Sequence, residues 1–388
     1  MRKEWQAALA VIQKIQEAGF EAVFVGGAVR DRLLGKTAND IDIATSALPD
    51  EVKRIFHKTV DVGIEHGTIL VLDAGVPIEV TTYRTEGDYA DFRRPEVVQF
   101  VRNLEDDLKR RDFTINALAE RNTGEIVDLF GGQADLHARV IRAVGSAEER
   151  FSEDALRMLR AARFSAQLGF TIENNTFLAI KQHAPLIEHI AIERIAIELE
   201  KMWLSEMPIT GMRVLIDSGL SDYLPGDFQA IYHKWISFHA TDVKDGWAYF
   251  ILTTKDESLI KHYKLSNKEK NYYIQIRDAL TLLQKSEVSS IELFETDIFA
   301  IQKAAYFAKL LHVNTCDVKK LIERKNSFVL QDRRELMVSG NDLLEWKGSR
   351  GGPWVKEALS RMLQAVLEGQ VENDQQQLKD WFIRYDNN

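Results

Sequence analysis

The stretch FVGGAVRDRLLGKTANDIDIATS, residues 24–46, decides what fold to expect for the first part of the chain. An apolar run ends at Gly26 and Gly27, and the Arg-Asp pair Arg30 and Asp31 follows. This order predicts a strand, a tight turn and the start of a helix, because glycine lets the backbone turn sharply. The free N–H groups of that helix start and the Arg30 guanidinium suit a phosphate, while Asp31 suits pairing with a neighbouring basic group.

The second half of the stretch predicts a strand that carries two carboxylates on one face. Side chains alternate along a strand, so Asp40 and Asp42 should share a face while Ile41 and Ile43 enter the core. Two such carboxylates can share a Mg²⁺ ion with substrate phosphates, and Glu79 on another predicted strand is a candidate third. An Asp-x-Asp or a Gly-Gly alone is more typical of a surface turn or a helix cap. Their combination favours two-metal phosphoryl transfer.

The strand patterns are confined to the first third of the chain. After about residue 145 the sequence predicts helix after helix. The expected fold is an α+β head, a mixed β-sheet with helices, followed by all-helical domains. The predicted strands are residues 21–27, 40–45, 68–73, 77–84 and 97–101. The expected domains are a catalytic head (1–145) and three helical parts, a neck (146–205), a body (206–270) and a tail (271–388).

Composition narrows the possible classes of protein. The 388 residues carry a net charge of −9, which argues mildly against indiscriminate binding of nucleic acid. Cys316 is the only cysteine, so no intramolecular disulfide and no cysteine-based zinc site is possible. The start of the chain predicts an amphipathic helix and lacks the apolar core of a signal peptide, and no apolar run is long enough to span a membrane. These features favour a cytoplasmic protein with no membrane partner.

Four motifs together resemble one family. GGAVRD followed by DIDIAT resembles the signature of the polymerase-β-type nucleotidyltransferases. Within that superfamily the likeness is to the bacterial-type (class II) tRNA nucleotidyltransferases, the CCA-adding enzymes, and to their poly(A) polymerase relatives. RRDFTINALA (residues 110–119) is similar to the second motif, EDALRMLRAARF (153–164) to the nucleotide-selecting motif, and ERIAIELEKM (193–202) to the helix that braces it.

The resemblance implies an activity and its partners. A member of this family adds and repairs the 3′-terminal CCA of tRNA, uses CTP and ATP with Mg²⁺, and releases pyrophosphate. Catalysis would fall to Asp40, Asp42 and Glu79, with the metal on the two aspartates. Family members often form homodimers, which is an expectation here as well.

The resemblance also implies how the base is chosen. On a helix capped at its start by Ser152, Asp154 and Arg157 would be surface neighbours. A carboxylate beside a guanidinium complements the Watson–Crick edges of cytosine and adenine, and it opposes the reversed edges of guanine and uracil. The family is understood to use these two positions as a protein template.

The following arginines have two readings. Arg160 is expected to hold the nucleotide or the Arg157 side chain. Arg163 should point roughly opposite Asp154, toward phosphates or a neighbouring helix, because each step of three turns about −60° around a helix. As an alternative, these arginines form a ladder with Glu148, Glu149 and Glu153 on a solvated face.

The second motif adds contacts to the sugar and the phosphates. Arg111 matches the family's nucleotide-binding position, and Asp112 suits a ribose hydroxyl, with Asn116 in support. An acid at a helix start is the alternative for Asp112. The polar segment RTEGDYADFRRPE (residues 84–96) is predicted to be a mobile loop, and the family likeness makes its full length favour addition of the final adenosine.

Three further points complete the expectations. KHYKLSNKEKNYYIQIR (residues 261–277) suits either tRNA phosphates or an ordinary amphipathic helix, and SRGGPW (349–354) suits either a phosphate or a plain helix start. The chain has no His-Asp dipeptide, so no additional phosphohydrolase activity is expected. The alternatives to CCA addition are an A-adding enzyme, a poly(A) polymerase or a non-catalytic tRNA-binding protein.

Overall fold

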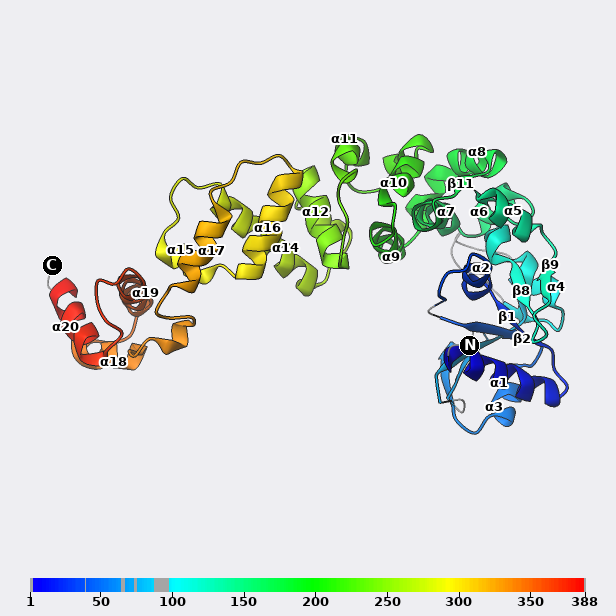
Figure 1. The fold of residues 1–388 in the computed structure, drawn as a ribbon, viewed down its shortest axis with the longest axis horizontal. Coiled ribbons are helices and arrows are strands. Elements are labelled where there is room, and N and C mark those ends of the chain that lie inside the picture. Colours follow the sequence, from blue (N-terminus) through cyan, green and yellow to red (C-terminus); the bar gives the residue numbers. More distant parts are fainter. Residues whose placement is uncertain (1–2, 39, 64–66, 73–74, 87–97, 387–388) are drawn as a thin grey trace. The chain divides into compact units, whose positions relative to one another are not determined.

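A computed structural model describes residues 3–38, 40–63, 67–72, 75–86 and 98–386 of the chain (Figure 1). It divides into two compact units. The first comprises residues 1–246 and 261–264, and the second comprises residues 247–260 and 265–388. None of the helices in the described part of the chain is both long and apolar enough to cross a membrane.

A mixed seven-stranded sheet forms the centre of the N-terminal head, in the order β3-β4-β5-β2-β1-β8-β9. Most neighbours are antiparallel, but β2 pairs with β5 in parallel, so the sheet is mixed as expected. Its strands are β1 (Ala22–Val25), β2 (Asp42–Thr45), β3 (Thr59–Gly63), β4 (Thr68–Val71), β5 (Ile78–Thr82), β8 (Leu118–Glu120) and β9 (Ile126–Asp128).

Each of the five predicted strand segments contains a strand, but the sequence missed three strands of the seven-stranded sheet. β3 is an edge strand whose residues are mostly exposed, and β8 and β9 have three residues each, so their patterns are too weak or too short to recognise. The segment 77–84 also contains the start of a second element: β6 (Arg84–Glu86) pairs with β7 (Val98–Phe100) in a separate two-stranded ribbon. The predicted mobile loop between these two strands lies largely outside the described residues.

Helices cover this sheet because their apolar residues recur at helical spacing. The first helix, α1, buries Trp5, Val11, Ile12 and Ile15, and it packs on β1, β2 and β5. A third helix, α3, contacts α1 and β4 (Figure 1). The helices of the head are α1 (Lys3–Glu17), α2 (Gly27–Leu33), α3 (Pro49–Ile55), α4 (Leu104–Lys109) and α5 (Gly132–Ala138), with a 3₁₀ turn at Thr114–Asn116.

The remainder of the first unit is helical with one exception. β11 (Thr171–Ile172) pairs in parallel with β10 (Val140–Ile141), so the prediction that strands end near residue 145 is wrong at this point. Two residues are too few to give a strand pattern. The helices are α6 (Ala147–Glu153), α7 (Leu156–Leu168), α8 (Asn174–His183), α9 (Ile192–Trp203), α10 (Pro208–Asp217) and α11 (Phe228–Ile231).

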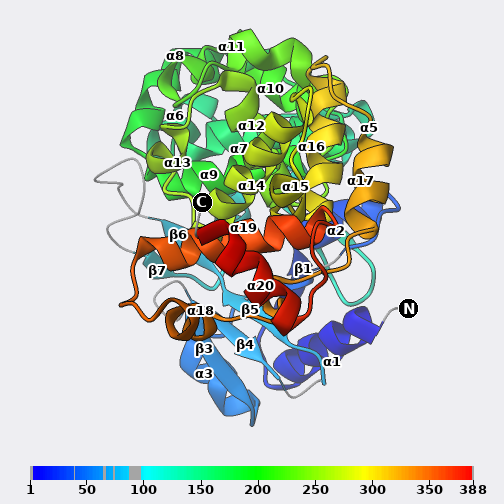
Figure 2. The same cartoon turned by 90° about the vertical axis from the view of Figure 1, so that its left-hand side faces the viewer.

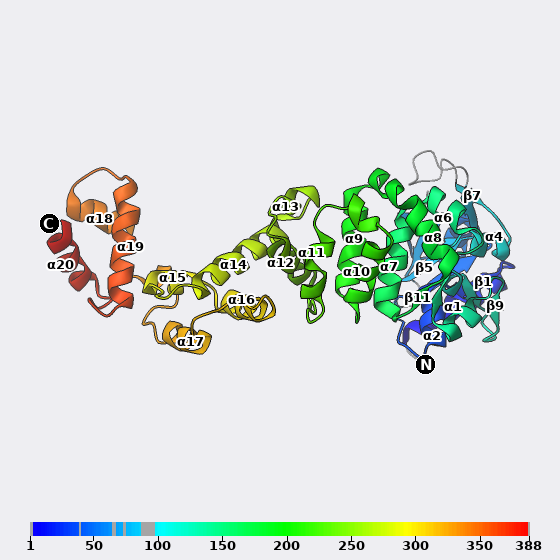
Figure 3. The same cartoon turned by 90° about the horizontal axis from the view of Figure 1, so that it is seen from above.

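The second unit is all-helical in its described residues. Two of its helices begin with reciprocal caps, because Ser266 and Glu269 satisfy each other's backbone N–H groups in α14, as do Ser289 and Glu292 in α15. Helices α14 and α16 lie side by side in Figure 3, and α18, α19 and α20 lie together in Figure 2. The helices are α12 (Val243–Thr254), inside which the unit begins, α13 (Leu259–His262), α14 (Asn267–Leu283), α15 (Ser290–Glu295), α16 (Ile298–Leu310), α17 (Val318–Asn326), α18 (Gly340–Lys347), α19 (Pro353–Leu367) and α20 (Gln375–Asp386).

Candidate functional site

The glycine turn between β1 and α2 is tight and crowded. Gly26 has φ 68° and ψ −137°, a conformation that favours glycine, and it caps the start of α2. A Cβ atom on Gly26 would lie 3.1 Å from an Nη of Arg111 and 3.9 Å from a carboxylate oxygen of Asp42. The turn therefore brings the predicted phosphate-binding glycine, Arg111 and Asp42 to one place.

Three carboxylates gather at one end of the neighbouring strands, and we call them the carboxylate edge: Asp40, Asp42 and Glu79. Asp42 is the first residue of β2 and lies in register with Glu79 on the parallel strand β5. All three line a cavity of about 400 Å³. Ile41 and Ile43 are buried, as the alternation predicted, although the strand begins at Asp42 and Asp40 lies just before it.

The electrostatics of the carboxylate edge favour a cation. Burial and the Glu79 carboxylate raise the pKa of Asp42, Asp40 adds to the rise, and Arg111 opposes it. In the described part of the chain, no three His, Cys, Asp or Glu side chains form a ready metal cage. Mg²⁺ does not require one, because it is usually held by one or two carboxylates together with water and substrate phosphates. The donor set at this edge therefore fits Mg²⁺.

Arg111 is fixed from behind. Its guanidinium donates to a carboxylate oxygen of the buried Asp107 at 3.0 Å and to the carbonyl oxygen of Asn116 at 3.3 Å. Its Nε is buried and has no hydrogen-bond partner among the described residues. A guanidinium held beside a glycine turn with an unused donor is suited to an incoming anion.

Arg30 lies deeper than the sequence suggested. It is buried, forms an ion pair with Asp31 at 2.7 Å and donates to the Asn116 side chain, also at 2.7 Å. Its guanidinium lies over the Phe164 ring, 5.2 Å from the centroid. Asp31 thus pairs with a basic neighbour, as predicted. The structure places Arg30 among packed side chains, next to Gly27.

Asp112 belongs to the same buried cluster. Its oxygens accept from the Phe113 backbone N–H, the Asn116 amide and both Nε and an Nη of Arg160. Burial alone would raise the pKa of Asp112, but Arg160 and Asn116 outweigh burial and lower it to about 2. Asp112 does not cap a helix, because Phe113 occupies the cap position of the following 3₁₀ turn.

The predicted nucleotide-selecting helix is interrupted. α6 ends at Glu153 and α7 begins at Leu156, and we call residues 153–157, which span this gap, the helix break. Ser152 lies inside α6, so its prediction as a helix cap is wrong; Ser146 caps α6 instead. The sequence hid this break because no Gly or Pro marks it.

The break gives Asp154 and Arg157 separate partners. Asp154 forms an ion pair with Arg194, the third residue of α9, at 2.8 Å. Arg157 is buried, pairs with Glu153 at 2.6 Å and donates to the backbone carbonyl of Arg110 at 3.0 Å. The pairing with Glu153 matches one rung of the alternative ladder, but the burial of Arg157 excludes a solvated face for it.

Arg160 and Arg163 also form ion pairs with specific partners. Arg160 pairs with Asp112, and Arg163 pairs with Glu198 of α9 and donates to Gln167. The expectation that Arg163 reaches a neighbouring helix is thus confirmed. Helix α9 binds both ends of the selecting region, through Arg194 and Glu198.

Sequence reasoning missed three residues that organise this site: Asp107, Arg194 and Glu198. Only Asp107 has a local signal, because an acid three and four residues before two arginines is typical of a helical ion-pair cluster. Arg194 lies 40 residues from its partner and Glu198 lies 35 from its own, so no spacing rule could have joined them.

Three family models match the chain along its length. They are the poly A polymerase head domain at residues 22–142, a probable RNA and SrmB-binding site of polymerase A at 169–228, and a putative tRNA nucleotidyltransferase domain 2 at 238–382. A CCA-adding enzyme of Bacillus cereus (strain G9842) is 41% identical over 98% of both chains. The chain belongs to the family of CCA-adding enzymes.

Other members of the family support the same assignment. A CCA-adding enzyme of Lactiplantibacillus plantarum is 44% identical, over 97% of this chain and 96% of that one. The crystal structure of the Bacillus stearothermophilus CCA-adding enzyme in complex with CTP superposes with a TM-score of 0.88 at 39% identity, covering 100% of this chain and 98% of the other. The fold is therefore that of a CCA-adding enzyme, a nucleotidyltransferase head with a helical remainder.

Proposed function

We propose that this CCA-adding enzyme builds and repairs the 3′-terminal CCA of tRNA from CTP and ATP and releases pyrophosphate. The observation that carries the proposal is the register of Asp42 with Glu79 beside the glycine turn and Arg111. It puts acids for a cation next to donors for a triphosphate, because the glycine turn lies close to both Asp42 and Arg111. Catalysis of phosphoryl transfer consists largely of such positioning and charge stabilisation.

The metal proposal rests on the carboxylate edge. Asp40 and Asp42 hold Mg²⁺, and Glu79 lies next to them as the third acid. When bound, paired Mg²⁺ ions activate the attacking hydroxyl and neutralise charge on the leaving pyrophosphate. The chain's own contribution is to place both acids at the cavity, where the buried Ile41 lines the same space and the buried Ile43 anchors the strand in the core.

The triphosphate proposal rests on the turn after β1. Backbone N–H groups of the Gly26–Gly27 turn and the buried Nε of Arg111 donate to phosphate oxygens. Arg30 supports this turn from below through Asn116. Each carboxylate oxygen of Asp112 already accepts two N–H donors. For Asp112 to accept from a ribose hydroxyl, Asn116 or Arg160 has to give up its hydrogen bond to one of these oxygens.

The base-selection proposal rests on the helix break. Asp154 accepts from the exocyclic amino group of cytosine or adenine, and Arg157 donates to the adjacent ring nitrogen. Arg157 is already held in place by Glu153 and the Arg110 carbonyl. One carboxylate oxygen of Asp154 accepts from the base while the other keeps its ion pair with Arg194. Arg160 and Arg163 hold α7 in place through their ion pairs with Asp112 and Glu198.

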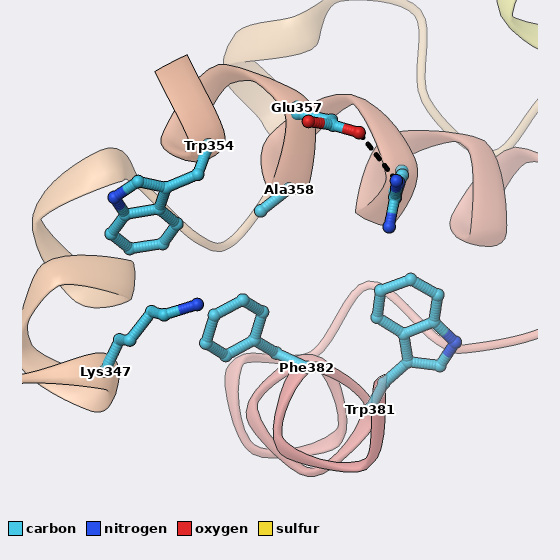
Figure 4. A pocket seen from close by; sticks show the side chains of 7 residues that line it. Lys347, Trp354, Glu357, Ala358, Trp381 and Phe382 are labelled. Carbon is cyan, nitrogen blue, oxygen red and sulfur yellow. Dashed lines mark hydrogen bonds and ion pairs between the residues drawn. The ribbon is translucent and has the colours of Figure 1, made fainter. Parts of the chain in front are cut away.

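The tRNA proposal rests on a pocket in the second unit, formed by α18, α19 and α20. Figure 4 shows Trp354, Phe382 and Trp381 facing a shared space of about 180 Å³. Lys347 lies 4.9 Å from the centroid of the Trp354 ring, and Arg361 pairs with Glu357 at 2.6 Å. Aromatic walls with cations at the rim suit RNA, because bases stack on aromatic rings and phosphates attract cations.

The proposed domain limits and assembly belong with this function. A head at 1–145 and a neck at 146–205 would carry the chemistry, a body at 206–270 and a tail at 271–388 would hold tRNA, and two chains would associate as a homodimer. Light scattering of the purified protein tests the dimer, since a mass of one chain at micromolar concentration would contradict it.

One assay tests the function and its alternatives. tRNA lacking its 3′ end is supplied with Mg²⁺ and labelled CTP alone, ATP alone, or both. Full CCA requires both nucleotides, whereas an A-adding enzyme extends only tRNA that already ends in CC. A long adenosine tail would indicate a poly(A) polymerase, and no incorporation would indicate a binding protein.

A further inference from the structure

Asp107, in the helix α4, is a buried carboxylate with an unusual number of donors. Its side chain is 1% exposed. One oxygen accepts from Nε and Nη of Arg110 at 3.0 and 2.7 Å and, more weakly, from the Arg84 backbone N–H at 3.4 Å. The other oxygen accepts from an Nη of Arg111 at 3.0 Å. One carboxylate therefore fixes two consecutive arginines and the first residue of β6.

The charge on Asp107 is maintained by these partners. Burial would raise the pKa of Asp107, but Arg111 and Arg110 outweigh burial and hold the pKa below its ordinary value. A buried ionised acid is costly unless every oxygen is satisfied. Since the proposed mechanism gives Asp107 no contact with metal or nucleotide, its retention in the core needs another explanation.

On the phosphate side, Asp107 acts on Arg111. The Arg111 guanidinium is held between Asp107 and the glycine turn, and its charge lowers the pKa of Asp42 against burial and Glu79. Without Asp107, the guanidinium would lose its strongest partner and could reorient toward Asp42. The donors aimed at a triphosphate would then be displaced.

On the base side, Asp107 acts on Arg157 through the backbone of Arg110. The Arg110 side chain folds back onto Asp107, while its carbonyl oxygen accepts from Arg157 at 3.0 Å. A side chain fixed at one end of a residue limits where the carbonyl of the same residue can point. The position of the Arg157 side chain therefore depends on Asp107, through the side chain and the carbonyl of Arg110.

The helix that carries Asp107 is itself firmly held. Leu104 and Leu108 belong to a buried cluster with Val25, the residue before the glycine turn, and Ala44 of β2. The carboxylate of Asp107 is thus fixed relative to β1, which leads into the glycine turn, and to β2, which carries Asp42.

We propose that Asp107 is a positioning residue for both halves of the nucleotide site. Its carboxylate orients the Arg111 guanidinium toward the phosphates. Through the Arg110 side chain it also orients the Arg110 carbonyl, which accepts from Arg157, the residue that contacts the base. The proposal rests on the proposed function and deepens it. Because Asp107 contacts both Arg110 and Arg111, triphosphate affinity and base choice depend on the same carboxylate.

Asp107→Asn tests the proposal in the full-length enzyme with tRNA lacking its 3′ end. Asparagine keeps the shape but turns one oxygen into an amide donor that opposes the N–H groups of an arginine. The KM for CTP should rise about tenfold or more, and UTP incorporation relative to CTP should rise by a similar factor, while kcat at saturating CTP changes less. The KM for CTP of Asp107→Asn/Arg111→Ala should not exceed that of Arg111→Ala alone.

A second variant separates the two halves and does not depend on the first one folding. Arg110→Ala frees the backbone that carries the carbonyl but leaves Asp107 with Arg111. It should raise UTP incorporation relative to CTP while the KM for CTP stays within about twofold of wild type. An unchanged UTP-to-CTP ratio in Arg110→Ala overturns the base-side half of the proposal.

The matched control is Glu120→Gln, which removes another buried carboxylate of the head, that of Glu120 in β8, which pairs with Arg32 at 2.7 Å. Thermal unfolding of each variant fixes an assay temperature at which all are folded. If Asp107→Asn, like Glu120→Gln, leaves the KM and the UTP-to-CTP ratio at wild-type values, its role is structural and the proposal is overturned. A wild-type protein that incorporates neither nucleotide overturns the proposed function, and this inference with it.

Discussion

The carboxylate edge and the helix break differ in how their charges are satisfied. Among the described residues, Asp40, Asp42 and Glu79 form no ion pair, and Arg111 is the cation that lowers the pKa of Asp42 against burial, Glu79 and Asp40. At the helix break, Asp154 and Arg157 each have a specific partner of opposite charge. The first region is built to receive a charge from outside, and the second is already balanced within the protein.

This difference suggests different sensitivities to substitution. Removing a side chain from the carboxylate edge removes a proposed metal ligand and breaks no ion pair among the described residues. Removing one from the helix break also leaves its partner uncompensated, because a buried charge without its mate is destabilising. We therefore expect loss of rate at the edge and loss of discrimination at the break.

The largest expected effect is that of Asp40→Ala. Loss of a metal carboxylate should lower incorporation of CMP by roughly a thousandfold or more, while tRNA binding changes little. Single-turnover incorporation and a filter-binding assay measure the two quantities. Asp61→Ala, at an exposed acid of β3, is the control and should behave as wild type. Comparable turnover in Asp40→Ala would remove Asp40 from the metal site.

Arg157→Ala should act on choice rather than on rate. It removes the proposed donor to the base, takes one of two arginine partners from Glu153, and removes the Arg157 donor from the Arg110 carbonyl. Incorporation of UTP or GTP relative to CTP should rise about tenfold to a hundredfold, and the KM for CTP should rise less. Arg213→Ala, at an exposed arginine of α10, serves as control. Unchanged discrimination in Arg157→Ala would show that the base is read elsewhere.

Stacking in the tail should affect only the RNA substrate. Trp354→Ala should raise the KM for tRNA about tenfold, since stacking of one base on an aromatic ring contributes about 1–3 kcal/mol. The KM for CTP should not change. Val329→Ala, at a residue 75% exposed in the same unit, is the control. A KM for tRNA equal to that of the control would exclude the pocket from binding.

Arg194→Ala should give a smaller effect than Arg157→Ala. Asp154 loses a partner that only orients it, so discrimination against UTP should fall about threefold to tenfold. The double variant Arg157→Ala/Arg194→Ala should discriminate no worse than Arg157→Ala alone. Additive losses would contradict the view that Arg194 acts through the base-reading pair.

The smallest effect concerns Asp112, which joins the two regions. Its pKa falls from an ordinary 3.8 to about 2 on folding, so the ionised form stabilises the folded state. That contribution is fully present above pH 4 and is lost as the pH falls toward 2. Urea unfolding from pH 5 to 2 should show a steeper loss of stability in wild type than in Asp112→Asn. Parallel curves would mean that the Asp112–Arg160 pair does not contribute.

The predictability of the two regions follows the same division. The carboxylate edge could be predicted because the short spacing of Asp40 and Asp42 at the start of a strand keeps both acids at one end of the sheet, and a parallel neighbour supplies Glu79. The helix break could not, since nothing in SEDALR marks a stop, the partner of Asp154 lies 40 positions away, and the backbone acceptor of Arg157 lies 47 positions away. The short strands β8 and β9 were missed for lack of length, although β8 carries the carbonyl that accepts from Gly26.

The bond from Arg157 to the Arg110 carbonyl has a practical consequence for engineering. The acceptor is a backbone carbonyl oxygen, so no substitution of Arg110 removes this oxygen atom. A chimaera that grafts residues 146–205 of one relative onto the head of another would transplant the arginine but leave behind the peptide group against which it is aligned. The nucleotide preference of such a hybrid should therefore follow that of the relative that supplied residues 146–205 only if residues 104–111 come from the same relative.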